Sequence, residues 1–281
     1  MEIGASTRLL AVLGDPVAHS LSPCMHNAAI RALGLDAAFV ALRTSATALP
    51  TVLQALAAVE AAGNVTVPHK EATERYVARK TDLCERVGAC NTFWTEHGAL
   101  VGDNTDVPGV RAALHTLVGG GGGGEGVDGA ERWLVLGTGG SARAVAIAAA
   151  DVRALVLVRS REPGRARAFV DWAASRKVAA RVAAATEPCD IVINTTPLGL
   201  KETDALPILP TRLNGTRAAL DLVYAPGETP WVRALRAAGI TACDGRELLV
   251  HQGAAAFTRF FPGEVPPLDV MRAAVARALR A

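Results

Sequence analysis

Residues 133–142 read Trp-Leu-Val-Leu-Gly-Thr-Gly-Gly-Ser-Ala, and their pattern is the most informative one for the fold. Its apolar first half is typical of a buried strand, and small residues continue as a helix over 143–150. Gly137, Gly139 and Ala142 fit the pattern G-x-G-x-x-G/A between that strand and that helix. Such glycines let the backbone approach a pyrophosphate at the helix N-terminus. The stretch predicts a Rossmann dinucleotide-binding domain; the alternative is a tight turn whose glycines serve only packing.

The residues after the next strand, 155–158, bear on the choice of dinucleotide. About twenty residues beyond the glycines, NAD enzymes usually carry Asp or Glu for the ribose 2′-hydroxyl. This chain has Ser160 and Arg161 there, with Arg165 one turn later. Positive charge suits a 2′-phosphate, so the sequence favours NADP over NAD. Glu162 is the one residue that argues for NAD.

Strands and helices alternate along most of the chain. Apolar stretches between turn signals predict strands at 9–13, 37–42, 64–67, 90–94, 99–101, 133–136, 155–158, 178–182, 191–194 and 218–223. Helical periodicity predicts helices at 22–33, 49–59, 107–118, 143–150, 165–174, 230–238, 248–257 and 267–280. The alternation indicates an α/β protein with parallel, helix-covered sheets, with a hairpin over 90–101 at one edge. The glycine-rich segment 119–129 is expected to be a flexible surface connection.

A second informative stretch, residues 64–70, reads Asn-Val-Thr-Val-Pro-His-Lys. It predicts a strand over 64–67 and a helix that has Pro68 at its first position and runs to Tyr76. Lys70 then lies in the first turn, where the helix dipole disfavours a cation. A lysine in this position is either an exposed surface residue or one with a chemical task. Asp106, which closes the polar segment 102–106, is likewise either the N-cap of the next helix or part of that chemistry.

The composition of the chain indicates which classes of partner to expect. The 281 residues carry 29 basic and 27 acidic side chains without long runs of one sign, which implies neither nucleic acid nor an anionic membrane. No run of eighteen apolar residues occurs, so we expect a cytoplasmic protein with a small-molecule partner. The five cysteines contain no Cys-x-x-Cys, and no His-Glu-x-x-His occurs, so no metal site is expected.

Seven motifs in one order resemble shikimate dehydrogenase across nearly the whole chain: 14–23, 64–70, 90–92, 102–106, 194–199, 221–224 and Gln252 within its helix. The resemblance implies reversible, NADP-linked reduction of 3-dehydroshikimate to shikimate, a step toward chorismate and the aromatic amino acids. It also implies two α/β domains. The first is an open, discontinuous substrate-binding domain of residues 1–106 completed by C-terminal helices in 244–281. The second is a Rossmann NADP-binding domain of residues 107–243.

The resemblance assigns roles residue by residue. Lys70 and Asp106 match the family's catalytic pair and also contact substrate. Ser20, Ser22 and Tyr224 would hold the substrate carboxylate, and Thr66, Asn91 and Gln252 the ring oxygens. The implied cofactor contacts are Gly137, Thr138, Gly139, Gly140, Ser141, Ala142, Ser160, Arg161, Arg165, Thr195, Leu222 and Gly245. Ser160 and Glu162 depart from the family's common Asn-Arg-Thr-x-x-Arg. Chemistry supports the catalytic pair independently, because ketone reduction needs a proton at oxygen, which an ammonium beside a carboxylate can relay.

Three alternatives stay open. A quinate or aminoshikimate dehydrogenase of the same superfamily would keep nearly all of these residues. A non-catalytic NADP-binding regulator would be expected to lack Lys70 or Asp106, and both are present. Neither residues nor resemblance fixes the oligomeric state, and a homodimer is one alternative.

Overall fold

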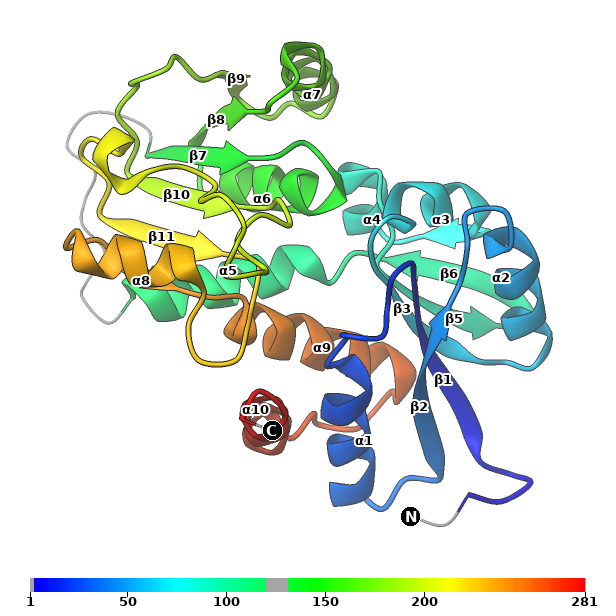
Figure 1. The fold of residues 1–281 in the computed structure, drawn as a ribbon. Helices are drawn as coiled ribbons and strands as arrows, with labels where there is room; N and C mark the ends of the chain where they lie inside the picture. The colour runs from blue at the N-terminus through cyan, green and yellow to red at the C-terminus, as the bar shows by residue number, and fades with distance from the viewer. Residues whose placement is uncertain (1–2, 120–130, 281) are drawn as a thin grey trace. The chain divides into compact units, whose positions relative to one another are not determined.

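The computed structural model describes residues 3–119 and 131–280. Apart from Gly119, the glycine-rich connection expected at 119–129 lies outside the described residues. The chain divides into two compact units: a first unit of Met1–Gly109 with Leu249–Ala281, and a second unit of Val110–Leu248. These limits lie close to the expected domain boundaries at 106 and 244. Figure 1 shows the elements of each unit.

The first unit is a mixed sheet with helices. Its strands are β1 (Arg8–Gly14), β2 (Ala37–Arg43), β3 (Ala62–Val65), β4 (Arg79–Lys80), β5 (Thr92–Glu96) and β6 (Ala99–Asp103), and its helices are α1 (Ser22–Ala32), α2 (Leu49–Ala58), α3 (Lys70–Tyr76), α4 (Asp82–Val87), most of α9 (Arg246–Phe260) and α10 (Leu268–Ala278). The strand order is β2-β1-β3-β5-β6-β4. Only β5 runs antiparallel to its neighbours among these strands. The predicted hairpin is therefore confirmed, but its placement at the edge is wrong, because β4 pairs in parallel outside β6.

An apolar and an aromatic cluster contribute to the core of the first unit within the described residues. One joins Leu49, Leu53 and Leu56 of α2 to strand residues such as Leu13 and Phe93. The other is aromatic: His26 of α1 stacks on Phe39, with ring centroids 4.4 Å apart, and lies near Phe257 and Phe260 of α9. The C-terminal segment thus completes a core that begins near the N-terminus.

The second unit is an all-parallel sheet. Its strands are β7 (Arg132–Leu136), β8 (Leu155–Arg159), β9 (Ala180–Val182), β10 (Ile191–Asn194), β11 (Ala218–Asp221) and β12 (Thr241–Cys243). Its helices are α6 (Gly140–Asp151), α7 (Pro163–Ser175) and α8 (Pro230–Ala237), with a 3₁₀ turn, η1 (Pro210–Arg212). Helix α5 (Asp106–Val118) spans the boundary between the units. The order β9-β8-β7-β10-β11-β12 is the 3-2-1-4-5-6 order of Rossmann sheets. The predicted fold class is confirmed, with the point where strand order reverses between β7 and β10.

The turn before Lys70 differs from the sequence expectation. Strand β3 ends at Val65, so the strand expected over 64–67 is present but lies two residues earlier. Helix α3 begins at Lys70, so the expected helix start at Pro68 is wrong. A turn occupies the gap: His69 N donates to Thr66 O at 2.9 Å, and the Val67 side chain is exposed. Lys70 nevertheless lies in the first turn of its helix, as predicted.

Candidate active site

Three predicted substrate contacts, Ser20, Ser22 and Thr66, lie in the segments that follow the neighbouring strands β1 and β3. Strands β1 and β3 pair in parallel with Leu13 opposite Val65, which places the residues that follow them side by side. A Cβ on Gly14 would lie 2.5 Å from Thr66 Cγ2, so only glycine permits this approach. Ser20 and Ser22 end the loop that Gly14 begins, and Ser22 N donates to Ser20 Oγ at 3.3 Å. These hydroxyls lie at the carboxyl edge of parallel strands, where ligands of open sheets bind.

Lys70 and Asp106 form a nearly buried ion pair. Lys70 Nζ lies 2.6 Å from Asp106 Oδ2, with the two side chains 13% and 8% exposed. Charges removed from water to this extent are screened little by salt. The structure thus brings the two predicted catalytic residues into direct contact.

Asn91 holds the other oxygen of the carboxylate. Its Nδ2 donates to Asp106 Oδ1 at 2.7 Å. The alternative that Asp106 only caps its helix does not hold, because α5 already includes Asp106 and both carboxylate oxygens accept from other side chains. Asn104 Oδ1 instead accepts the Asp106 backbone N–H at 3.2 Å. The carboxylate is therefore oriented toward Lys70.

Sequence reasoning missed the buried residues that fix Asn91. Its Oδ1 accepts from Thr105 N at 2.7 Å and from Thr92 Oγ1 at 3.1 Å. Asn64 Nδ2 donates to Thr92 Oγ1 at 3.0 Å and to Asn91 O at 3.2 Å. These three residues lie inside the polar motifs, which was the available signal, but periodicity does not distinguish a buried polar side chain from an exposed one.

Gln252 is buried in α9 and belongs to the same unit as Lys70. Its Nε2 donates to Leu249 O at 2.9 Å. One amide hydrogen thus serves the helix backbone, and a contact from Gln252 to substrate stays a prediction.

The glycine-rich turn lies at the reversal of strand order in the second unit. Strands β7 and β10 pair with Leu136 opposite Asn194, so Gly137 and Thr195 follow neighbouring strands. Thr195 donates to Leu136 O from its N at 2.9 Å and from its Oγ1 at 2.7 Å. Gly137 has φ +111°, and a Cβ there would lie 2.5 Å from Thr195 Oγ1, so both conformation and space require glycine. Gly137 and Thr195, both predicted cofactor contacts, are therefore in close contact.

The start of α6 fits a pyrophosphate. Gly139 precedes the helix, and within the described part of the chain no atom beyond Gly139 and its two chain neighbours lies within 4 Å of where its Cβ would be. The helix has no side-chain cap and no acidic residue in its first turn, while Ala142 is fully buried against the sheet. Backbone N–H groups at such a terminus attract anions.

The arginines after β8 are exposed. Arg165 Nε pairs with Glu162 Oε2 at 3.0 Å, and both side chains are about two-thirds exposed, at 67% and 66%. Ser160 Oγ accepts from Glu162 N at 3.2 Å. Within residues 3–119 and 131–280, the Arg161 guanidinium makes no hydrogen bond or ion pair. Glu162, the residue that argued for NAD, thus pairs with Arg165.

A buried carboxylate organises the strand ends beside β10. Asp221 accepts from Asn194 Nδ2 at 2.8 Å and from Thr229 Oγ1 at 2.8 Å, and burial raises its pKa to about 6. Leu222 and Tyr224 follow it. A Cβ on Gly245 would lie 2.3 Å from Leu222 O, so these two predicted cofactor residues are in close backbone contact. Tyr224 belongs to the second unit, so a role beside Ser20 and Ser22 of the first unit stays a prediction.

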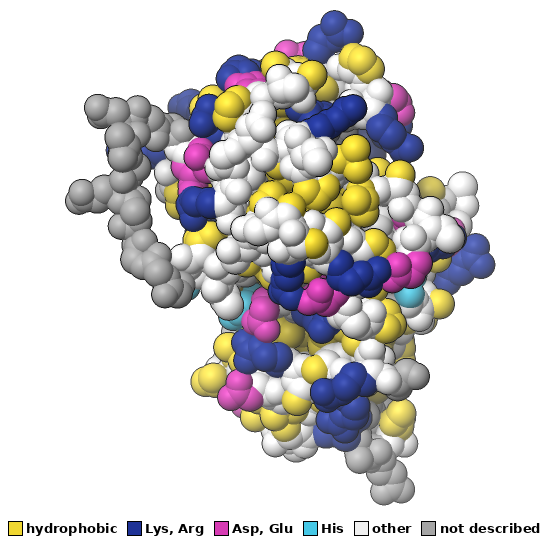
Figure 2. All heavy atoms as spheres, turned by 60° about the vertical axis from the view of Figure 1, so that its left-hand side comes forward, with side chains coloured by type: hydrophobic (Ala, Val, Ile, Leu, Met, Phe, Trp, Pro, Cys, Tyr) yellow, Lys and Arg dark blue, Asp and Glu magenta, His cyan; other side chains and the backbone are white. Residues whose placement is uncertain are grey.

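The described residues contain neither a candidate membrane span nor a candidate metal site. No helix in 3–119 or 131–280 is long and apolar enough to cross a membrane. The same residues contain no group of three or more His, Cys, Asp or Glu side chains that could hold a metal ion. On the face drawn in Figure 2, basic and acidic side chains are interspersed.

Two family models match segments that lie almost wholly in the first unit. Residues 12–93 match a family model described as the shikimate dehydrogenase substrate binding domain, and residues 245–276 match one described as the shikimate 5′-dehydrogenase C-terminal domain. The shikimate dehydrogenase (NADP(+)) of Symbiobacterium thermophilum is 38% identical over 97% of this chain and 95% of its own. The chain belongs to the shikimate dehydrogenase family. The resemblance predicted from the seven motifs is thereby confirmed.

Solved structures of shikimate dehydrogenases share the fold. The enzyme of Thermus thermophilus, crystallised with NADP(H) and shikimate, is 36% identical and superposes with a TM-score of 0.83 over 96% of this chain and 99% of its own. A 5-ketofructose reductase of Gluconobacter, at 25% identity and a TM-score of 0.82 over 98% of this chain and 100% of its own, has the same fold. Fold alone therefore does not select the substrate.

The shikimate dehydrogenase match covers much of the site described above. The substrate-binding model spans Ser20, Ser22, Thr66, Lys70 and Asn91. It ends before Asp106, yet the structure joins Asp106 to both Lys70 and Asn91.

Proposed function

We propose that this chain is an NADP-dependent shikimate dehydrogenase that reversibly reduces 3-dehydroshikimate to shikimate on the way to chorismate and the aromatic amino acids. The buried Lys70–Asp106 pair, within a member of this family, carries the proposal. Its proposed setting is the cytoplasm. Measuring the molar mass of the protein in solution would distinguish a monomer from a homodimer.

Lys70 and Asp106 carry out the proton transfer of the reaction. NADPH, when bound, supplies the hydride that the carbonyl carbon accepts. Lys70 donates a proton from Nζ to the carbonyl oxygen, and in the reverse direction its amine accepts the hydroxyl proton. Asp106 holds Nζ in place and stabilises the ammonium form, while Asn91 keeps the carboxylate from turning away.

Hydroxyl and amide groups hold the substrate in this proposal. Ser20 and Ser22, with Tyr224, bind the carboxylate of the ring. Thr66, Asn91 and Gln252 bind its oxygens. The adjacency of Gly14 and Thr66, which brings the serine loop beside the 64–70 turn, supports the assignment.

The second unit holds the cofactor. Residues 137–142 take the pyrophosphate on the uncapped end of α6, beside Thr195. Ser160, Arg161 and Arg165 would hold the 2′-phosphate, and Leu222 and Gly245, which are in close backbone contact, would also hold the cofactor. The open space beside Gly139 supports this placement.

Steady-state assays of the purified protein, followed by NADPH absorbance, test the function. We expect shikimate with NADP to give the highest kcat/KM of the four pairings of shikimate or quinate with NADP or NAD. Equal or better turnover of quinate would make the chain a quinate dehydrogenase. Absence of turnover with every pairing would favour the non-catalytic regulator.

Arg161→Ala tests the cofactor assignment. A guanidinium can make a bidentate, charge-assisted contact with the 2′-phosphate, which NAD lacks. Hydrogen bonds to charged groups contribute about 1.5 to 3 kcal/mol, so KM for NADP should rise roughly 10- to 100-fold while NAD turnover stays unchanged. Arg165→Ala should act in the same direction but more weakly, because Glu162 already pairs with that side chain. Arg167→Ala, an exposed position on the same helix, is the control. Equal losses with both cofactors would refute the assignment.

A further inference from the structure

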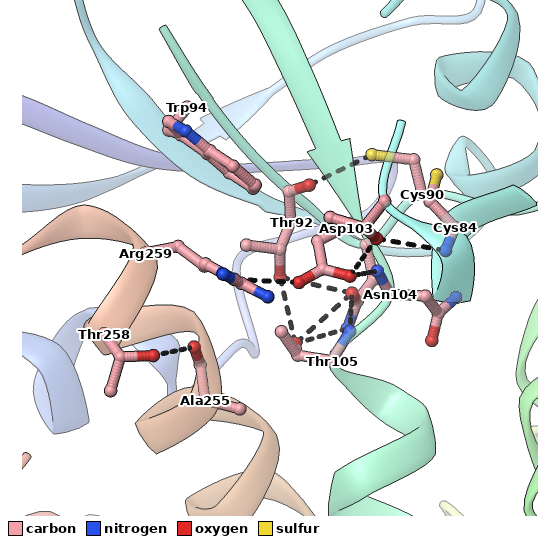
Figure 3. A network of polar contacts seen from close by, with 12 residues as sticks. Cys84, Cys90, Thr92, Trp94, Asp103, Asn104, Thr105, Ala255, Thr258 and Arg259 are labelled. Atoms are coloured by element: carbon pink, nitrogen blue, oxygen red, sulfur yellow. Dashed lines mark hydrogen bonds and ion pairs between the residues drawn. The ribbon is translucent and has the colours of Figure 1, made fainter. Parts of the chain in front are cut away.

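Asp103 is a buried carboxylate at the end of β6, and Figure 3 shows the groups around it. One oxygen, Oδ1, accepts from Asn104 N at 2.7 Å and from Thr81 Oγ1. The other, Oδ2, accepts from Arg259 Nε at 3.0 Å. A buried carboxylate costs free energy unless it is paired and hydrogen-bonded, so each of these donors matters.

Arg259 reaches this carboxylate from α9, 156 residues further along the chain. Its guanidinium carbon lies 5.5 Å from the centroid of the Trp94 ring, a cation–π contact that holds the side chain from a second direction. Asp103 is 4% exposed and Arg259 is 47% exposed, so one end of the pair is fixed in the interior of the unit. The pair thus joins β6 to the C-terminal helix.

Both ends of this link are close to proposed substrate contacts. Asp103 precedes Asp106 by three residues, and its backbone O accepts Asn91 N at 3.2 Å. Gln252 lies seven residues before Arg259 in α9, which is about two helical turns, so both point from one side of the helix. A shift of Arg259 relative to Asp103 would therefore move Gln252 relative to Asn91.

We propose that Arg259 is a positioning residue for shikimate binding: its ion pair with Asp103 sets the helix that carries Gln252 against the segment that carries Asn91 and Asp106. The inference rests on the proposed function. Arg259 itself touches neither substrate nor cofactor in this account.

Arg259→Ala and Arg259→Lys, assayed with shikimate and NADP, test it. Arg259→Ala removes the charge-assisted hydrogen bond that positions the helix carrying Gln252. Because Gln252 is then less well placed to bind the substrate, KM for shikimate should rise about tenfold or more. Removing binding that ground and transition states share changes KM and leaves kcat nearly unchanged. KM for NADP should not change. Arg259→Lys keeps a cation near Asp103 and should restore much of the shikimate affinity.

Arg272→Ala, which breaks an ion pair with Asp269 on α10, is the matched control and should leave KM unchanged. A folded Arg259→Ala protein with wild-type KM for shikimate, even one that melts earlier, would overturn the inference. If Arg259→Ala does not fold, the same KM measurement is made on Arg259→Gln, which keeps one hydrogen-bond donor toward Asp103. An unchanged KM for shikimate in that variant would likewise overturn the inference. A wild-type protein without shikimate turnover would instead remove the proposed function.

Discussion

Lys70→Ala is expected to lower kcat by roughly 10²- to 10⁴-fold, the usual contribution of a positioned general acid or base, with a smaller change in KM for shikimate. Nζ lies 2.6 Å from Asp106 Oδ2 and is the proposed proton donor to the carbonyl oxygen. Alanine leaves no ionisable group there. Steady-state rates in both directions, with circular dichroism to establish folding, measure the effect.

Lys80→Ala is the matched control for this variant. Lys80 also lies in the first unit and is also ion-paired, with Nζ 2.5 Å from Glu74 Oε1. No part of the proposed site includes it, so its loss should leave kcat unchanged. A Lys70→Ala protein that kept more than about a third of wild-type kcat would show that Lys70 is not the proton relay.

His26→Phe is expected to make the free energy of unfolding far less sensitive to acid. His26 is fully buried and stacks on Phe39, and among the described residues neither ring nitrogen has a hydrogen-bond partner of ordinary geometry. Burial lowers its pKa to about 3. The Asn64 side chain opposes the effect of burial on the His26 pKa only in part. The unfolded chain, with a histidine pKa of about 6.5, binds the proton more readily. The contribution of His26 to the free energy of unfolding is therefore fully present above about pH 6.5 and is lost as pH falls toward 3. At pH 4 this loss is about 3 kcal/mol.

Urea unfolding of wild type and variant at pH 7 and pH 4 measures this difference. Asp221 contributes with the opposite sign, since its folded pKa of about 6 exceeds that of an unfolded aspartate, and it stabilises the fold increasingly as pH falls from about 6. Because both proteins contain Asp221, its contribution cancels in the comparison. The exposed His97, replaced by Gln, is the control. An equal loss of stability in wild type and His26→Phe would refute the account of His26.

Local patterns in the sequence predicted the parts of the fold that local chemistry controls. The turn at Gly137 needs a positive φ and a close approach, and only glycine provides both, so its spacing was informative. Lys70 lies in the first turn of its helix as predicted, although that helix begins at Lys70 itself and not at Pro68. Strand β10 was predicted with the boundaries it has.

Features that depend on distant pairing were not predictable in this way. Strand β4 has two residues and exists because β6 lies beside it. Strand β12 was missed for a similar reason. The Asp103–Arg259 pair joins residues that no periodicity connects, and the burial of His26 results from aromatic side chains of β2 and α9. In the site, the contact of Lys70 with Asp106 was inferred from the resemblance, whereas the role of Asn91 in orienting Asp106 required coordinates.

Lys70 and Asp106 are proposed to act at the reacting oxygen of shikimate. A crystal structure of the protein with shikimate and NADP tests it most directly. We expect Lys70 Nζ within hydrogen-bond reach, about 2.6 to 3.2 Å, of the ring hydroxyl whose carbon exchanges hydride with the nicotinamide. A shikimate ring whose reacting hydroxyl lay out of reach of both Lys70 and Asp106 would contradict the account.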